Sequence, residues 1–273
     1  MLKICEKNKS FNGFQEVYEH QSSTTKSKMR FAVYKPKNSK NCQVLFFLSG
    51  ITCTEQNFIQ KSGYQKYASN KNIAVVVPDT SPRGKNIPDS EDYKLGCGAS
   101  FYLNALTNPW STNYNMYDYV TLELPKIIED NFNFDIKKLG IFGHSMGGGG
   151  AIQIALKNPN IFKTVSAFSP ICSIIKSDFS KKTIQEYLGS NVDSINTYDP
   201  ITLIKLLQRE DTIKIDVGLD DEYLENLYIK EFEKECQKHN QKLEINYHQG
   251  YGHNYYFIHS LIESHFQFHS SLI

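Results

Sequence analysis

The run Gly143-His144-Ser145-Met146-Gly147 has the form G-x-S-x-G, with a serine between two glycines. A serine hydroxyl is a poor nucleophile at neutral pH. It attacks an acyl carbonyl when an imidazole takes its proton and a carboxylate orients that imidazole. The glycines permit the tight turn that holds such a serine exposed. These residue types and their spacing predict acyl-transfer chemistry with Ser145 as the nucleophile.

The segments on either side of this motif match the context that it requires. Residues 139–142 (LGIF) are apolar and strand-like, and residues 146–157 are typical of a helix with small residues in its first turn. Strand, sharp turn and helix together form a nucleophile elbow. The glycine run at residues 147–150 lacks the Lys-Ser/Thr of a P-loop and the G-x-G-x-x-G spacing of a dinucleotide site, which excludes both.

Candidates for the acid and the base follow two late predicted strands, in the order Ser, acid, His that is found in α/β-hydrolases. The strand at residues 213–217 leads into Asp220 and Asp221, and only one of two adjacent carboxylates can face a histidine. Asp216 is less suitable because it lies within the strand. His253 lies in a glycine-flanked loop between the last strand and the last helix, so it is the predicted base.

The other histidines are not assigned to the proton relay. His144 neighbours the nucleophile on a sharp turn, where adjacent side chains point in different directions, and is expected to pack beneath the elbow. His265 and His269 have helical i,i+4 spacing, but neither a third ligand nor an H-E-x-x-H pattern accompanies them. We therefore predict no metal and no cofactor.

An oxyanion hole needs two backbone N–H groups aimed at the developing negative charge. The first follows from the elbow and is the N–H of Met146, the residue after the nucleophile. The second is expected after an early buried strand that ends in Ser49-Gly50, which makes the N–H of Ile51 the candidate. A plain strand-to-helix connection is the alternative at this position.

Length and composition bound the fold and its partners. A chain of 273 residues without a Pro/Ser-rich or charged linker predicts a single domain over residues 1–273. With 30 Lys+Arg, 29 Asp+Glu and a net charge of +1, no basic face suggests nucleic acid, so the expected partner is a small molecule. No signal peptide or membrane span is evident. Six cysteines without C-x-x-C spacing favour reduced thiols in the cytoplasm.

Short apolar runs alternate with longer amphipathic ones, which is typical of a mostly parallel central sheet with helices on both faces. This pattern predicts an α/β fold. Strands are expected at residues 29–34, 44–48, 73–77, 139–142, 164–168, 213–217 and 243–247. Helices are expected at residues 56–69, 116–131, 146–157, 222–239 and 254–268. Residues 78–109 are rich in turn-forming residues and predict a long loop.

Over nearly its whole length, the chain resembles the S-formylglutathione hydrolase (esterase D) family of the α/β-hydrolase superfamily. The most specific matching blocks are residues 48–58 (LSGITCTEQNF), 78–84 (PDTSPRG), 143–148 (GHSMGG), 167–172 (AFSPIC) and 252–257 (GHNYYF). The resemblance implies a cytosolic, homodimeric serine thioesterase that hydrolyses S-formylglutathione to glutathione and formate, the last stage of glutathione-dependent formaldehyde removal.

Carried over residue by residue, the resemblance implies Ser145 as nucleophile, Asp221 as the orienting acid and His253 as base. It favours Asp221 over Asp220, a choice that the residues alone leave open. It also implies Met146 and Ile51 as the oxyanion donors.

Other positions are less directly assigned. The resemblance places the thiol of Cys53 beside the site, which implies sensitivity to thiol reagents without a thiol step; a small buried hydrophobe is the alternative. Gly149 stands where the family usually has a histidine, and Gly252 where an aspartate usually precedes the base. Trp110 is a candidate for the pocket wall. Arg83, or a lysine in its loop, is a candidate for binding the glutathione carboxylates.

Three alternative functions share these residues. A short-chain carboxylesterase of broad specificity would use the same triad on simple esters. An acyltransferase would pass the acyl group to an alcohol instead of water. A binding or scaffold protein on a hydrolase fold would have no turnover, although the complete set of catalytic residue types argues against it.

Overall fold

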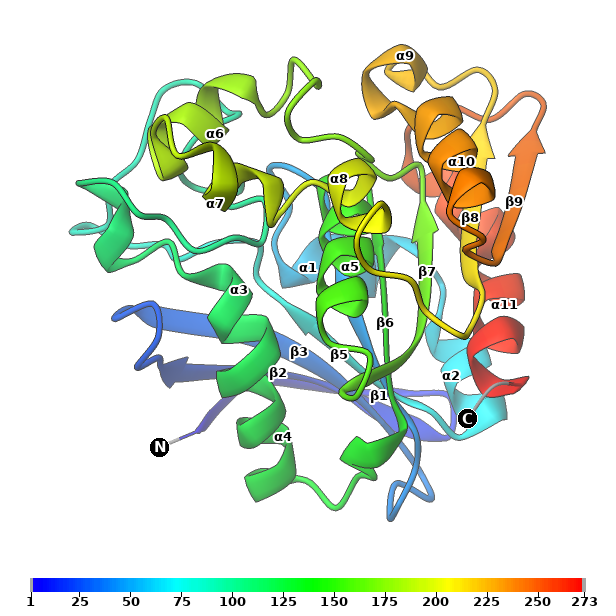
Figure 1. Ribbon diagram of the computed structural model, residues 1–273. Coiled ribbons are helices and arrows are strands. Elements are labelled where there is room, and N and C mark those ends of the chain that lie inside the picture. The colour runs from blue at the N-terminus through cyan, green and yellow to red at the C-terminus, as the bar shows by residue number, and fades with distance from the viewer. Residues whose placement is uncertain (1, 272–273) are drawn as a thin grey trace.

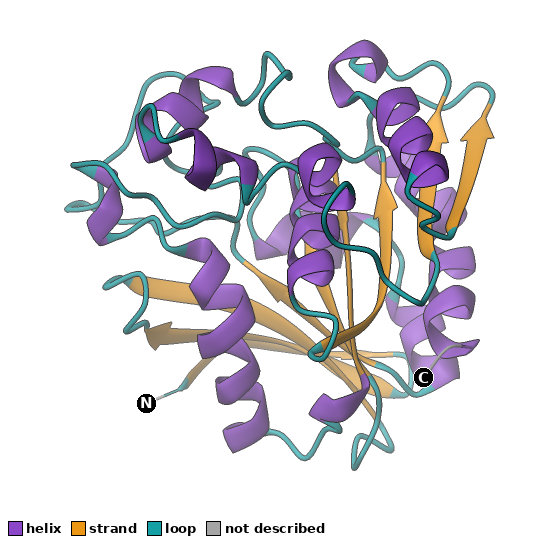
Figure 2. Ribbon diagram, in the orientation of Figure 1, coloured by secondary structure: helices purple, strands orange, loops and turns teal. Residues whose placement is uncertain are grey.

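The computed structural model describes residues 2–271, and it contains one sheet with the strand order β1-β2-β3-β5-β4-β6-β7-β8-β9 (Figures 1 and 2). Neighbouring strands from β1 to β5 are antiparallel, and those from β5 to β9 are parallel. The strands are β1 Lys3–Ser10, β2 Gly13–Gln21, β3 Lys28–Pro36, β4 Val44–Leu48, β5 Ala74–Pro78, β6 Leu139–His144, β7 Phe162–Phe168, β8 Ile213–Gly218 and β9 Leu243–His248.

Helices cover both faces of this sheet, and each face has its own apolar core (Figure 1). Side chains alternate along β4: Val44, Phe46 and Leu48 join one core, while Leu45 and Phe47 join the other. The first core includes α4 Leu124–Asn131, α5 Met146–Lys157 and α10 Ile229–Lys238. The second includes α1 Glu55–Lys61, α2 Gln65–Lys71 and α11 Tyr255–Ser271. Shorter helices are α3 Met116–Asp118, α6 Lys181–Leu188, α7 Val192–Asn196, α8 Pro200–Ile204 and α9 Leu224–Leu227.

The predicted α/β class and mostly parallel sheet are confirmed, and each predicted strand is present to within two residues at either end. Strands β1 and β2 were not predicted. Most side chains of β1 are polar and exposed at the sheet edge, so the strand lacks the apolar pattern that identifies buried strands. Residues 79–109 contain neither a helix nor a strand, as the turn-forming residues predict.

Two predicted helices are interrupted. The helix expected at residues 56–69 divides into α1 and α2 because Gly63, with φ of 66°, turns the chain between them. The helix expected at residues 222–239 divides at Tyr228, whose φ of 56° is also left-handed. A left-handed residue breaks the i to i−4 hydrogen-bond ladder, and apolar periodicity does not reveal it.

A buried polar network joins α11 to the sheet. The carboxylate of Asp216 on β8 contacts His265 Nε2 at 3.0 Å and His248 Nε2 at 2.6 Å, and Lys214 Nζ at 3.3 Å. The Ser166 hydroxyl on β7 links His265 to His269 at 2.7 and 2.8 Å. Burial would raise the pKa of Asp216, but these hydrogen bonds and charges hold it well below the usual range. The network fixes the helix that follows His253.

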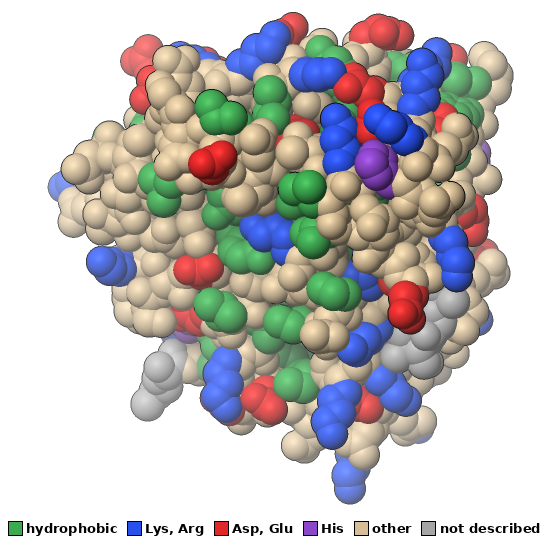
Figure 3. Space-filling view, viewed as in Figure 1, with side chains coloured by type: hydrophobic (Ala, Val, Ile, Leu, Met, Phe, Trp, Pro, Cys, Tyr) green, Lys and Arg blue, Asp and Glu red, His purple; other side chains and the backbone are tan. Residues whose placement is uncertain are grey.

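Charges on the surface are mixed. On the face seen in Figure 3, basic and acidic side chains are interspersed instead of forming one large field of either sign. In the part of the chain that the structure describes, no helix is both long and apolar enough to cross a membrane.

Buried histidines predict a loss of stability in mild acid. Burial, and then the proximity of His265 and Lys214, lower the pKa of His269 well below its ordinary value. The unfolded chain therefore binds more protons than the folded chain below about pH 6.5, so stability falls as the pH falls, by up to about 1.4 kcal/mol per pH unit for each such histidine. Urea unfolding at pH 7, 6 and 5 measures this slope, which we expect to be smaller in His269→Asn. An equal slope in both proteins would contradict the assignment.

Candidate active site

Ser145 lies at the turn between β6 and α5, with a backbone φ of 57° and ψ of −119° that few non-glycine residues adopt. The turn is held on both sides. The Ser145 N–H donates to Phe168 O, while Ser145 O accepts from the N–H groups of Gly149 and Ile171, each at 3.0 Å. Strained backbone fixed by its surroundings is the geometry that a nucleophile elbow requires.

The glycines around Ser145 permit close backbone packing. A Cβ on Gly147 would meet the carbonyl of Leu48, and one on Gly149 would meet the carbonyl of Ile171. Gly50 lies against the nucleophile itself, because a Cβ there would be 3.2 Å from Ser145 Cβ. Gly147 and Gly149 in the first turn of α5 therefore fit between neighbouring segments only without side chains.

The structure brings Asp221, and not Asp220, to the predicted base. Asp221 Oδ2 is 2.7 Å from His253 Nδ1, and Asp221 Oδ1 accepts the N–H of Tyr223 at 2.9 Å. Burial would raise the pKa of Asp221, but the hydrogen bond and charge of His253, with the Tyr223 N–H, lower it. The carboxylate therefore stays ionised beside the imidazole. Asp220 is exposed, and Asp216 belongs to the network behind the sheet.

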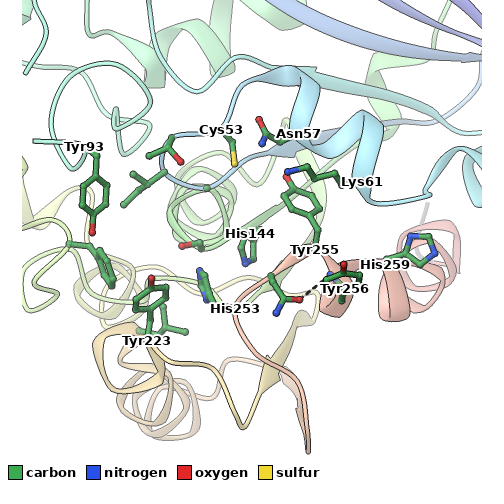
Figure 4. A pocket seen from close by; sticks show the side chains of 17 residues that line it. Cys53, Asn57, Lys61, Tyr93, His144, Tyr223, His253, Tyr255, Tyr256 and His259 are labelled. Carbon is green, nitrogen blue, oxygen red and sulfur yellow. Dashed lines mark hydrogen bonds between the residues drawn. The ribbon is translucent and has the colours of Figure 1, made fainter. Parts of the chain in front are cut away.

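Ser145 and His253 line the same cavity, which has a volume of about 860 Å³ (Figure 4). Asp221 engages His253 Nδ1, so Nε2 is the ring nitrogen that remains to exchange a proton. In the described structure, no hydrogen bond joins the Ser145 hydroxyl to His253. Such contacts are often loose without substrate and tighten when it binds.

Two backbone N–H groups near Ser145 are unpaired. Neither the Ile51 N–H nor the Met146 N–H has an acceptor among residues 2–271. Met146 is the first residue of α5, where N–H groups have no partner within the helix. Ile51 lines the cavity and follows Gly50, which packs against Ser145. Both N–H groups are therefore available to a negatively charged oxygen.

His144 does not simply pack beneath the elbow, as its position in the turn suggested. Its ring is part of the cavity wall, with its centre 4.4 Å from that of His253. Burial, and then His253, lower the pKa of His144 well below the usual value, which favours the neutral ring. Strand β6 ends at His144, so the His144 side chain lies at the carboxyl edge of the sheet, next to Ser145.

The prediction that Trp110 walls the pocket is wrong. The tryptophan is buried against Tyr114 and Tyr187, with ring centres 5.1 and 5.3 Å away, and it is not among the residues that line the cavity. The short turn at residues 110–112 directs it into this aromatic cluster. Arg83 is already engaged, since it pairs with Asp79 at 2.9 Å and donates to Cys53 O at 3.1 Å.

Cys53 lines the cavity, as the resemblance implied. Burial raises the pKa of its thiol, although Lys61 and Arg83 partly oppose this shift. The thiol is therefore protonated at neutral pH, which makes it a weak nucleophile.

Several cavity residues were not predicted from the sequence. They come from segments far apart in the chain, and although some lie in the 48–58 and 252–257 blocks, only the fold shows that they face one cavity. They are Asn57, Lys61, Tyr93, Phe179, Tyr223, Leu227, Asn254, Tyr255, Tyr256 and His259. Within residues 2–271, no group of three or more His, Cys, Asp or Glu side chains is arranged to hold a metal ion.

Neighbouring segments stabilise the His253 loop despite the glycine that precedes the histidine. Glu222 Oε2 accepts the N–H of His253 at 3.2 Å, and the N–H of Asp220 donates to Tyr251 O at 3.0 Å. A Cβ on Gly252 would be 3.4 Å from Glu222 Oε2. Glu222 thus places a carboxylate near the position where the family usually has an aspartate.

The parallel sheet, the elbow at its carboxyl edge and the cavity above it define an α/β-hydrolase. Residues 22–268 match the esterase family model described as "Putative esterase", so the chain belongs to this esterase family and is a hydrolase.

Solved structures agree with this assignment. An S-formylglutathione hydrolase from Agrobacterium tumefaciens is 42% identical, with a TM-score of 0.97 over 98% of this chain and 99% of that chain. The fluorophosphonate-binding serine hydrolase F of Staphylococcus aureus is 20% identical, with a TM-score of 0.75 over 95% and 99% of the two chains. An S-formylglutathione hydrolase from the same organism is 19% identical, with a TM-score of 0.73 over 94% and 98%. The last two likenesses show the fold alone.

The packing of the elbow predicts that Gly149→Ala is poorly tolerated. The added methyl meets the carbonyl of Ile171, whose N–H supports Ser145, and such overpacking costs about 1 to 3 kcal/mol of stability. Urea unfolding and the rate of fluorophosphonate labelling measure the two effects. Gly252→Ala is the matched control, because no neighbour is closer than 3.4 Å and it should behave like the wild type. Equal behaviour of the two variants would contradict this account.

Proposed function

We propose that this chain hydrolyses S-formylglutathione to glutathione and formate through a Ser145-His253-Asp221 triad. The observation that carries the proposal is the 2.7 Å contact between Asp221 and His253 in the wall of the cavity that Ser145 also lines. The 42% identity to an S-formylglutathione hydrolase over 98% of the chain supports the substrate.

In the first half of the proposed reaction, Ser145 Oγ attacks the formyl carbon and His253 Nε2 takes its proton. The N–H groups of Ile51 and Met146 stabilise the resulting oxyanion; one such donor contributes about 10² to 10³ in rate. The C–S bond then breaks, and His253 returns the proton to the departing thiolate. Asp221 keeps the imidazole in the required tautomer and stabilises its charged form.

In the second half, water attacks the formyl ester on Ser145. His253 removes a proton from the water, and the same two N–H groups stabilise the tetrahedral intermediate. The proton returns to Ser145 Oγ as formic acid leaves, and formic acid then ionises to formate and a solvent proton. A thiol is a good leaving group, so we expect deacylation to limit the rate.

Hydrolysis of short-chain aryl esters is a second candidate activity. The aromatic side chains of Tyr93, Phe179 and Tyr223 line one part of the cavity and offer an apolar surface for an aryl group. The same triad would act on both substrate classes.

We also propose a cytosolic location and a homodimer, which the family resemblance implies. All six cysteines are free, and this fits a reducing compartment. Sedimentation equilibrium measures the assembly state.

Replacing the nucleophile tests the proposed function. Ser145→Ala should lower kcat for S-formylglutathione by about 10⁴-fold or more, and the variant should not react with a fluorophosphonate. Circular dichroism should show an intact fold. Parallel kcat/KM measurements on S-formylglutathione and 4-nitrophenyl acetate decide between the thioesterase and the carboxylesterase. A wild-type enzyme that turns over only the aryl ester would refute the thioesterase proposal.

A comparison of the adjacent aspartates tests the proposed acid. Asp221→Asn should lower kcat by about 10³ to 10⁴-fold, because the amide no longer orients or stabilises the charged imidazole. Asp220→Asn is the matched control, since its exposed side chain does not contact His253, and it should stay within about threefold of the wild type. A larger loss in the Asp220 variant would mean that the acid is misassigned.

A further inference from the structure

We propose that Lys61 and His259 form a subsite that binds a carboxylate of the thiol portion of the substrate. This inference rests on the proposed function, because it concerns the part of S-formylglutathione that leaves with sulfur. It also assigns a role to two residues that lie outside the triad and the oxyanion hole.

The cavity has two unlike ends. In Figure 4, Lys61, Tyr256 and His259 lie to one side of His253, whereas Tyr93 and Tyr223 lie to the other. Lys61 is the only lysine or arginine among the described lining residues. The end near Lys61 therefore holds a cation, whereas the opposite end has no lysine or arginine among the described lining residues.

Lys61 is exposed and placed for a ligand. It is the last residue of α1, and its ammonium lies 5.7 Å from the centre of the Tyr255 ring in the cavity wall. Within residues 2–271 it forms no ion pair with an acidic side chain. The charge also acts on the site, since Lys61 opposes the rise in the pKa of the Cys53 thiol.

His259 packs against the turn that follows Lys61, between α1 and α2. A Cβ on Gly63 would be 2.6 Å from Cε1 and 2.9 Å from Nδ1 of His259, so the imidazole packs directly over this turn. His259 lies on α11 and Lys61 on α1, and both line the cavity. The glycine thus permits the His259 ring on α11 to pack against the turn two residues after Lys61, at the same end of the cavity.

Acidic groups lie next to the backbone of the His253 loop. Glu222 accepts the His253 N–H, and the exposed Asp220 is close by in the same loop. These carboxylates disfavour an anionic ligand beside the His253 loop, whereas the Lys61 ammonium attracts one. The chemistry of the proposed leaving group fits, because glutathione carries two carboxylates remote from its sulfur.

Other cations near the cavity are less suitable. Arg83 is paired with Asp79 and does not line the cavity, so it is a weaker candidate than Lys61 for binding a glutathione carboxylate. Lys94 lies 5.7 and 5.4 Å from the ring centres of Tyr93 and Phe179, but it does not line the cavity. It provides a stringent comparison, because it is a lysine beside the aromatic end.

The test compares inhibition of 4-nitrophenyl acetate hydrolysis by S-methylglutathione and by its dimethyl ester, in which both carboxylates are blocked and the amino group is unchanged. Lys61→Ala should raise Ki for the acid about 10-fold, the effect expected for loss of a charge-assisted contact, and change Ki for the diester less than twofold. His259→Ala should act in the same direction. Lys66→Ala is the matched control, since Lys66 lies 5.5 Å from the centre of the Tyr67 ring outside the cavity, and it should change neither Ki.

The outcomes separate this subsite from the proposed function. An equal rise of both Ki values in Lys61→Ala, a selective rise only in Lys94→Ala, or no inhibition of the wild type by S-methylglutathione would overturn the subsite. Failure of the wild type to hydrolyse S-formylglutathione would refute the proposed function instead, while the Ki comparison would still decide whether Lys61 binds a carboxylate.

Discussion

The candidate site depends on one steric constraint, the close packing of the first turn of α5 against the carbonyls of Leu48 and Ile171. This packing holds Ser145 in a left-handed conformation that costs about 1 to 3 kcal/mol by itself. The same contacts bring the Gly50 turn against Ser145, so the position of one proposed oxyanion donor follows from the position of the nucleophile. A side chain within this turn would disturb both groups together.

A second constraint is the buried polar network around Asp216. His253 lies on a loop between β9 and α11, and loops alone position side chains less firmly than strands or helices do. Here both flanking elements are attached to β8 through Asp216, by His248 at the end of β9 and by His265 on α11. The loop therefore has fixed ends, and Asp221 meets His253 from the strand that these contacts anchor.

Much of the fold could be predicted from the sequence because buried parallel strands such as β4 are continuous apolar runs. The elbow could also be predicted, since its glycines reflect a steric requirement. The choice between Asp220 and Asp221 could not be made from the residues alone, because adjacent positions have the same spacing to His253. The prediction that Trp110 walls the pocket was wrong because the sequence does not show which side of a loop faces a cavity. Lys61 and His259 lacked any signal, since only tertiary packing brings the turn after α1 against α11.

The segment from Ile51 to Gly63 contributes to several parts of the cavity at once. It supplies an unpaired N–H beside Ser145, the Cys53 thiol, the Lys61 ammonium and the glycine on which His259 packs. This stretch thus combines one proposed oxyanion donor with part of the proposed carboxylate subsite, while the proposed triad lies elsewhere in the chain. A change in leaving-group preference would have to keep the part of the stretch that contains Ile51 while the part that contains Lys61 and Gly63 diverges. Redesign of the leaving-group preference can therefore begin with the residues around Lys61 alone.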